Sequence, residues 1–206
     1  MRLYLIAMLD EAEKIIENYE LIQEVPFPLY KKDDNLVAIT GIGKVNSAFV
    51  TSNVISNFTV DEIINIGFVG AFGDFSVGDY VLVSKAIYHD VDATMFGYKK
   101  GQVPKMPEYY ISKNKNLSKL NDLSKSILYT GDYFMTESID DNYIADMEAT
   151  AIFQVAHRLN IPVLSVKVVS DIIGGSTHLD DYQEFEKVGS NNINKLYLKL
   201  EELLND

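Results

Sequence analysis

The chain of 206 residues contains no cysteine, only two arginines and no long uninterrupted run of hydrophobic residues. The lack of cysteine excludes disulfides, thiolate metal sites and cysteine nucleophiles. No stretch approaches the roughly 18–20 apolar residues that a membrane-spanning helix needs. Acidic residues directly follow the apolar start at 3–9, without the small-residue cleavage site of a secretory signal. We therefore expect a cytoplasmic protein.

Basic residues are also scarce, since 18 lysines and arginines face 30 aspartates and glutamates, which gives a net charge of -12. A chain with this charge repels the phosphate backbone of nucleic acids, so nucleic-acid binding is not expected. Hydrophobic residues at 47% and charged residues at 23% are ordinary for a globular protein. With no internal repeat and no linker, we expect one domain over residues 1–206.

Strand-like and helix-like patterns alternate along the chain. Strands are expected at 3–8, 36–39, 62–66, 79–83, 127–129 and 163–169, and helices at 10–16, 44–58, 147–159 and 183–204. Glycines at 67–73 are expected to end the third strand. This alternation is typical of parallel βαβ units in an α/β fold, with both faces of the sheet covered. Residues 97–121 form the best candidate for an excursion or lid loop.

Carboxylates follow or flank several of these elements. Glu11 comes after the first strand, Asp171 follows the valine-rich strand, and Glu148 opens a predicted helix. Ligands of open α/β sheets bind beyond the carboxyl ends of the strands, so these side chains are candidates for one site. Several acids without a metal cluster suit acid/base chemistry on a neutral leaving group.

Each carboxylate also has a structural interpretation. Glu11 and Glu148 fit the first turn of a helix, where acids favour the helix dipole, and Asp171 fits a turn after a strand. The stretch Gly41-Ile42-Gly43-Lys44 suggests phosphate binding but lacks the spacing of a phosphate loop. The three histidines are dispersed and lack metal-ligand spacing. Nothing in the sequence suggests a metal or an organic cofactor.

Several sequence blocks, in this order, resemble the 5′-methylthioadenosine/S-adenosylhomocysteine nucleosidases of the purine nucleoside phosphorylase superfamily. They cover almost the whole chain, and the set is far more specific than any single block. The blocks are Ala7-Met8 with Glu11, Gly41-Ile42-Gly43-Lys44-Val45, Asn65-Ile66-Gly67, Val77-Gly78-Asp79, Tyr88-His89-Asp90, Phe96-Gly97-Tyr98 with Gly101-Gln102 and Pro104, Gly131-Asp132 with Phe134, Met147-Glu148-Ala149-Thr150-Ala151-Ile152 and Val169-Ser170-Asp171.

The resemblance implies a three-layer α/β fold, with a central mixed twisted sheet flanked by helices, that cleaves an N-ribosidic bond to adenine with water. Glu11 would activate the water, Asp171 would protonate the purine at N7, and Glu148 would hold the ribose hydroxyls. Phe134 would stack on adenine and the Met135 backbone would contact the edge of the base. The full set of substrate-binding residues implied is Met8, Ile42, Phe68, Phe96, Pro104, Phe134, Met135, Asp146, Met147, Glu148, Ser170 and Tyr182.

The resemblance also implies a homodimer in which the partner helps to close the pocket for the 5′ group. Phosphorylases of the superfamily bind phosphate largely through arginine, and neither Arg2 nor Arg158 stands at a strand end. Arginine is the natural clamp for an oxyanion, so its absence there favours water as the nucleophile. A phosphate-dependent phosphorylase and a nucleoside-binding protein without catalysis remain the alternatives.

Three departures from the family pattern bear on activity. Phe68 stands where the family usually has serine, Lys167 stands where arginine is common, and the stretch between Phe134 and Asp146 is short. Phe68 removes a hydroxyl near the sugar and adds bulk. Because lysine lacks the planar fork of arginine, Lys167 leaves the anchoring of Glu11 or Glu148 open. These departures motivate the alternative of a protein that binds nucleosides without cleaving them.

Overall fold

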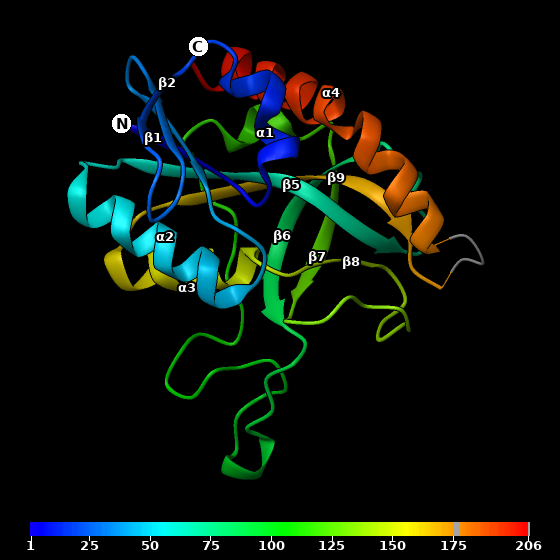
Figure 1. Cartoon of the computed structure of the whole chain (residues 1–206). Helices are drawn as coiled ribbons and strands as arrows, with labels where there is room; N and C mark the ends of the chain where they lie inside the picture. Colours follow the sequence, from blue (N-terminus) through cyan, green and yellow to red (C-terminus); the bar gives the residue numbers. More distant parts are fainter. Residues whose placement is uncertain (175–177, 206) are drawn as a thin grey trace.

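A mixed β-sheet with helices on both faces forms the frame of the protein (Figure 1). The computed structural model describes residues 1–174 and 178–205, and the side chains of 1–174 and 189–205. The described strands follow the order β2-β3-β4-β1-β5-β8-β7-β6-β9, and β5 also pairs with β9. Their bounds are β1 Arg2–Ile6, β2 Glu20–Gln23, β3 Leu29–Lys32, β4 Asn35–Ile39, β5 Glu62–Phe72, β6 Tyr80–Tyr88, β7 Ser124–Thr130, β8 Tyr143–Asp146 and β9 Val163–Ile172.

Parallel and antiparallel pairs share this sheet. β1 runs parallel to β4 and β5, and β5 runs parallel to β9. At one edge of the sheet, β2 and β3 form an antiparallel hairpin, and β3 pairs antiparallel with β4. At the other end β5 pairs antiparallel with β8, and β6 pairs antiparallel with β9. Since β7 joins β6 to β8, the strands β5, β8, β7, β6 and β9 close on themselves. The mixed sheet that the resemblance implies is confirmed.

Alternating side chains of the strands build one core on each face. Leu3 and Leu5 of β1 pack with Val54 of α2 (Lys44–Asn57) and Phe153 of α3 (Ala149–Leu159). Tyr4 and Ile6, which alternate with them along β1, belong to the core on the other face, with α1 (Leu9–Ile16) and α4 (His178–Asn205). Successive residues of a strand point to opposite faces, which explains the division. Figure 1 shows α2 and α3 together on one side of the sheet, and α1 and α4 on the other.

The predicted elements are present, but β5 is longer than expected. The glycines at 67–73 do not end the strand at 66, because β5 continues to Phe72. Its second half obtains hydrogen-bond partners from both β8 and β9, which support the backbone where glycine gives no side-chain packing. The strands β2, β3 and β8 have no counterpart among the predicted elements. Helix α4 begins at His178, earlier than the predicted 183.

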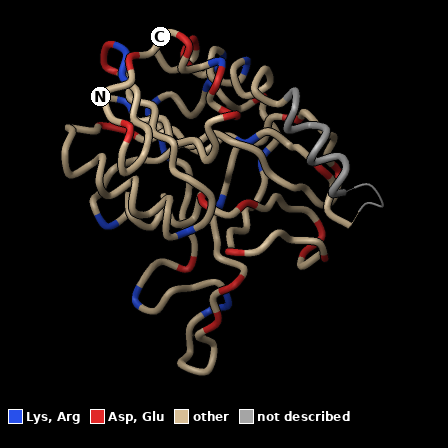
Figure 2. The backbone as a smooth tube through the Cα atoms, viewed as in Figure 1, with Lys and Arg blue, Asp and Glu red and all other residues tan. Residues whose placement is uncertain are grey.

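The segment between β6 and β7 contains the predicted excursion. Its first part projects away from the sheet (Figure 1), whereas Leu120, further along, is buried in the core with α1 and α4. The segment contains the 3-10 turns η1 (Thr94–Phe96) and η2 (Leu117–Leu120). Acidic and basic positions are interspersed along the described chain (Figure 2). Among the described residues, no helix combines the length and apolar character needed to cross a membrane.

Candidate active site

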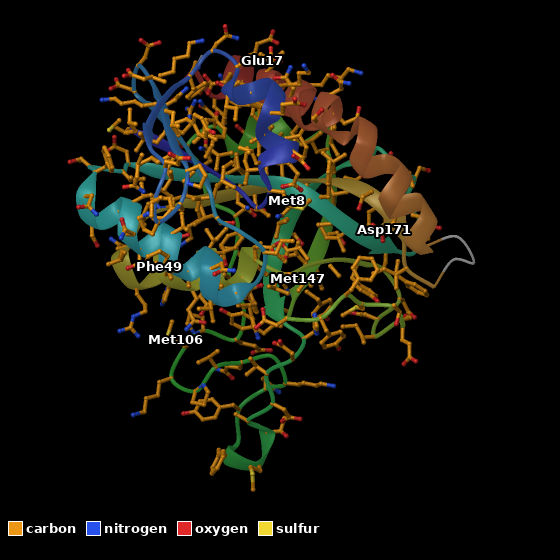
Figure 3. The ribbon with its side chains drawn as sticks, in the orientation of Figure 1. Met8, Glu17, Phe49, Met106, Met147 and Asp171 are labelled. Atoms are coloured by element: carbon orange, nitrogen blue, oxygen red, sulfur yellow. The ribbon has the colours of Figure 1, made fainter. Side chains whose placement is uncertain are left out.

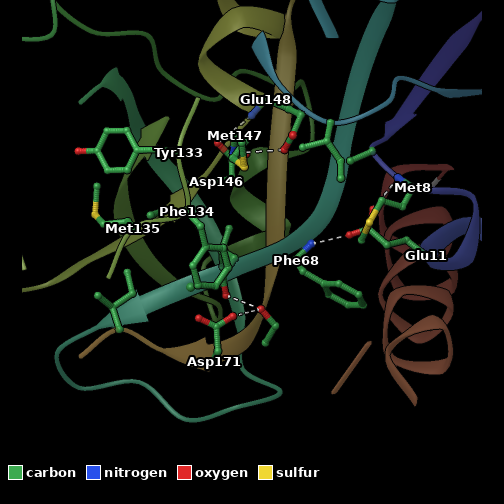
Figure 4. Close-up of a pocket in the computed structure, with 17 residues that line it drawn as sticks. Met8, Glu11, Phe68, Tyr133, Phe134, Met135, Asp146, Met147, Glu148 and Asp171 are labelled. Carbon is green, nitrogen blue, oxygen red and sulfur yellow. Dashed lines mark hydrogen bonds between the residues drawn. The ribbon is translucent and has the colours of Figure 1, made fainter. Parts of the chain in front are cut away.

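A cavity opens where the carboxyl ends of several strands meet (Figures 3 and 4). Because β1, β5 and β9 are mutually parallel, the residues after β1, in the second half of β5 and at the end of β9 reach the same edge of the sheet. The lining residues are Ala7, Met8, Glu11, Ile42, Phe68, Val69, Gly70, Tyr133, Phe134, Met135, Ala145, Asp146, Met147, Glu148, Ser170, Asp171 and Ile173.

Glu11 lies in the first turn of α1 and is only 3% exposed. Its carboxylate accepts a hydrogen bond from the backbone N–H of Met8 at 3.2 Å and another from that of Phe68 at 3.1 Å. Burial raises the pKa of Glu11 above its ordinary value, although these two N–H groups and the charge of Lys167 oppose the rise. Such a carboxyl group, buried but hydrogen-bonded as an anion, can serve as a base near neutral pH.

Glu148 precedes α3 and faces the same cavity. The N–H of Gly43 donates a hydrogen bond to Glu148 Oε1 at 2.8 Å. Gly43 has φ = 98°, a conformation that glycine adopts readily, so the sequence at this turn places the N–H donor. Burial, and then the negative charge of Asp146, raise the pKa of Glu148 to about 7.

Lys167 on β9 provides a buried positive charge beside these acids. Its ammonium forms an ion pair with Asp146 Oδ2 at 2.9 Å, and both side chains are almost wholly buried. Asp146 also accepts hydrogen bonds from the Thr130 hydroxyl at 2.6 Å and from the Ala149 N–H at 3.1 Å. The partner of Lys167 is therefore Asp146 rather than Glu11 or Glu148, whose pKa values it lowers from a greater distance.

Asp171 lies near the end of β9, on the opposite wall of the cavity (Figure 4). It is 1% exposed, and the Ser170 hydroxyl donates a hydrogen bond to its Oδ1. The same hydroxyl lies 3.1 Å from the carbonyl oxygen of Val69. Ser170 thus fixes the orientation of the Asp171 carboxyl group.

A second, smaller cavity adjoins the first behind Glu11. Its volume of about 20 Å³ is enough for one water molecule. Polar groups line most of it: Glu11, Thr40, Asn65, Glu148 and Lys167. Water needs two to four polar partners to occupy such a site, and this wall supplies them.

An aromatic loop closes the other side of the main cavity. Tyr133, Phe134 and Met135 follow β7, and all three line the cavity. The Tyr133 ring packs edge-on against the His89 ring, with 4.4 Å between the centroids. Phe134 is 43% exposed, so its ring is accessible to a planar ligand.

Phe68 contributes to the site mainly through its backbone. Its N–H holds Glu11, whereas its ring packs against helix α4. A Cβ atom at Gly189 of α4 would come within 2.1 Å of Phe68 Cζ, so glycine makes room for the ring. The bulk expected near the sugar is therefore accommodated at the helix, although Phe68 still lines the cavity.

The structure brings together most residues of the predicted site, but two of them lie elsewhere. Phe96 and Pro104 are exposed on the excursion and do not line the cavity of their own chain. The reason is that the excursion leaves β6 away from the sheet (Figure 1). The side chain of Tyr182 lies outside the described residues. The predicted residues that do line the cavity are Met8, Glu11, Ile42, Phe68, Phe134, Met135, Asp146, Met147, Glu148, Ser170 and Asp171.

Some lining residues had no signal in the sequence. Ile173 and Ala145 are ordinary core residue types whose place in the wall depends on how β5, β8 and β9 pair. Tyr133 could have been found, because it stands between Asp132 and Phe134 of a quoted block. The backbone donors at Gly43 and Phe68 could not, since every residue except proline carries an N–H.

Neither arginine is near the cavity. Arg2 pairs with Glu62 at 2.9 Å and with Glu201 at 2.8 Å, at the start of β1 and hence the opposite edge of the sheet. Arg158 is exposed near the end of α3. Within the described residues, no group of three histidine, aspartate or glutamate side chains is arranged to hold a metal ion.

Comparisons with known proteins agree with this geometry. Residues 2–205 match the family model of the phosphorylase superfamily. A 5′-methylthioadenosine/S-adenosylhomocysteine nucleosidase of Bacillus subtilis is 30% identical over 97% of this chain and 98% of its own length. The nucleosidase of Anoxybacillus flavithermus is 34% identical over 80% of this chain and 79% of its own.

Solved structures give the same result. The nucleosidase of Colwellia psychrerythraea in complex with adenine superposes with a TM-score of 0.87, at 28% identity, covering 99% of this chain and 96% of that one. The nucleosidase of Neisseria meningitidis in complex with methylthio-immucillin-A superposes with a TM-score of 0.84, at 29% identity. The match covers 95% of this chain and 96% of that one. The chain therefore belongs to the phosphorylase superfamily, within the family of 5′-methylthioadenosine/S-adenosylhomocysteine nucleosidases.

Proposed function

We propose that this protein hydrolyses the N-ribosidic bond of 5′-methylthioadenosine, S-adenosylhomocysteine or a related adenine nucleoside, and releases adenine. One observation carries the proposal: Glu11, Glu148 and Asp171, from three separate elements, line a single cavity. The named activity of the relatives supports the same reaction.

Glu11 is the base that activates water. A water molecule in the small polar cavity would lie beside the Glu11 carboxylate. As the bond from ribose C1′ to adenine N9 breaks, the water oxygen bonds to C1′ and its proton passes to Glu11. The sugar gains positive charge in this step, which nearby carboxylates stabilise.

The other two carboxyl groups act on the sugar and the base. Glu148, held by the Gly43 N–H, would accept hydrogen bonds from the ribose hydroxyls. Asp171 in its protonated form would donate a proton to purine N7, so that adenine leaves as a neutral molecule. The Ser170 hydroxyl supports this role by fixing the Asp171 carboxyl group.

The loop after β7 would bind the base. Phe134 has an accessible face for stacking on adenine, and the Met135 backbone would contact the edge of the ring. Met8, Ile42 and Met147 supply apolar surface for the sugar and the 5′ group. No cofactor or metal enters this mechanism.

Two variants test the catalytic roles. Glu11→Gln and Asp171→Asn keep the shape of each side chain but remove the base and the acid, respectively. We expect each to lower kcat for adenine release by at least about 100-fold, the usual scale of acid–base contributions. Adenine binding to Glu11→Gln, measured by calorimetry, serves as the folding control. Turnover like that of the wild type in either variant contradicts the proposal.

A second copy of the chain completes the site in this proposal. Apolar side chains are exposed on α2 and beside it, with Val45 78% and Phe49 49% exposed, and at the tip of the excursion, with Phe96 74% exposed. Exposed apolar side chains that gather in patches are typical of protein–protein interfaces, which favours burial of these side chains by a partner. A homodimer would bury it, and Phe96 and Pro104 from the second copy would then be available to close the pocket for the 5′ group.

Light scattering combined with size-exclusion chromatography tests this arrangement. We expect the wild type to elute with twice the mass of one chain. Val45→Glu should give monomers with a raised KM for 5′-methylthioadenosine, because the 5′ group loses its cover. Val25→Glu makes the same change at another exposed valine, 79% exposed, and serves as the matched control. A wild-type monomer with full activity would contradict the dimer.

A further inference from the structure

Lys44 lies at the centre of a charged cluster beside the cavity. It is the first residue of α2, and its ammonium pairs with Asp90 Oδ2 at 2.5 Å and with Asp132 Oδ2 at 3.4 Å. Its backbone N–H donates to Asp132 Oδ1 at 2.9 Å. Asp90 Oδ2 also accepts the N–H of Asp132 at 2.9 Å. Lysine and both aspartates are thus joined by side-chain and backbone contacts.

The cluster connects three segments that are far apart in the sequence. Lys44 directly follows Gly43, whose N–H holds Glu148 on the ribose side. Asp90 lies just beyond the end of β6. Asp132 lies at the root of the loop that carries Phe134 and Met135 on the base side. The cluster therefore ties the ribose side of the site to its base side.

The contact between Lys44 and Asp90 is more shielded from water than an ordinary surface ion pair, whereas the Asp132 side chain is 48% exposed. The side chains of Lys44 and Asp90 are only 22% and 18% exposed, so water screens their charges less. Burial alone would raise the pKa of Asp90, yet the hydrogen bonds from Lys44 and from the Asp132 N–H hold it below its ordinary value. Lys44 pairs with both carboxylates of the cluster, which disfavours the phosphate-binding interpretation of Gly41-Ile42-Gly43-Lys44.

We propose that Lys44 is a positioning residue that holds the loop of residues 131–135 in the geometry that binds adenine. The inference rests on the proposed function, because it assigns the base to this loop. Without the ammonium, the carboxylates of Asp90 and Asp132 would repel each other and the root of the loop would move away from β6. The contact between Tyr133 and His89, at 4.4 Å, keeps the segment attached, so the loop loosens rather than unfolds.

Lys44→Met tests the role, because it keeps most of the side-chain length and removes the charge. We expect the KM for 5′-methylthioadenosine and the Kd for adenine to rise about tenfold, a change of 1.4 kcal/mol. The kcat should stay within about threefold, since Lys44 touches no reacting group. Amide hydrogen exchange should become faster in residues 131–135. Lys44→Arg should restore the wild-type values, and Lys125→Met is the control that should change nothing.

Charge compensation makes the test specific. Lys44→Met/Asp90→Asn removes the repulsion while keeping an oxygen acceptor for the Asp132 N–H. It should therefore bind adenine more tightly than Lys44→Met alone, a recovery that a simple loss of packing would not produce. An unchanged Kd in Lys44→Met, or no recovery in the double variant, overturns the inference. Adenine binding and hydrogen exchange need no turnover, so a wild type that binds adenine but releases none would contradict the proposed function alone.

Discussion

At the scale of single residues, Glu148 occupies a position where its charge destabilises the folded protein. Burial and Asp146 raise its pKa from 4.5 to about 7, so the folded chain binds this proton more tightly than the unfolded chain does. The resulting stabilisation is fully present below about pH 4.5 and is lost as the pH rises through about 7. In the proposed mechanism, this same carboxylate binds the ribose hydroxyls.

Glu148→Gln should therefore be more stable than the wild type at high pH. The full pKa difference corresponds to about 3 kcal/mol, and we expect a gain of about 1–3 kcal/mol at about pH 8 that shrinks towards pH 5. Urea unfolding at both pH values measures it. Equal effects at the two values would show that the charge of Glu148 is not the cause.

The charge of Lys167, unlike that of Glu148, should stabilise the folded protein. Lys167→Met leaves Asp146 as a buried carboxylate without its cation, and breaking such a pair costs about 3–5 kcal/mol. Urea unfolding of this variant and of the exposed Lys125→Met at about pH 8 measures this loss. A loss below about 1 kcal/mol at pH 8 would contradict the account.

At the scale of elements, hydrophobic periodicity predicted the strands and helices that build the two cores. Apolar runs such as 36–39 are buried on both faces, and this burial is what the pattern records. It could not predict β2, whose residues are largely exposed and which depends on pairing with β3. Nor could it predict β8, a short strand supported by β5 and β7.

For the site as well, the sequence predicts some residues, whereas their surroundings depend on the tertiary arrangement. Glu11 and Asp171 could be predicted because carboxylates after strands point to chemistry at the edge of a sheet. Their environment could not be: the pairing of Lys167 with Asp146 depends on the closed arrangement of strands. Likewise, the exposed position of Phe96 depends on the direction in which the excursion leaves β6.

The contact between Phe68 and Gly189 gives a prediction that links β5 to α4. Alanine in place of a helical glycine normally stabilises by about 1 kcal/mol. Here we expect Gly189→Ala to destabilise by about 1–3 kcal/mol, because the new methyl group would overlap the Phe68 ring. In the Phe68→Ala background the same change should stabilise. Urea unfolding of the wild type, the two single variants and the double variant measures this double-mutant cycle. Additive changes in the free energy of unfolding would contradict a direct contact between the two residues.

At the scale of the whole molecule, the residues at the amino ends of the parallel strands and those at the carboxyl ends have different roles. At the amino end of β1, Arg2 joins Glu62 of β5 and Glu201 of α4 and so ties the ends of the chain together. At the carboxyl ends of the strands, buried acids line the cavity. Lys167, the cationic side chain among the described residues that line the smaller cavity, is paired with Asp146. This arrangement favours water over phosphate as the nucleophile.

Adenine release from 5′-methylthioadenosine, measured with and without added phosphate, tests the central claim most directly. Base release from S-adenosylhomocysteine, adenosine and inosine under the same conditions, with hypoxanthine as the base from inosine, would rank the nucleosides. We predict release of free adenine at the same rate in both conditions, with an unphosphorylated sugar as the second product. Release that requires phosphate, with a sugar phosphate as the product, would contradict the account.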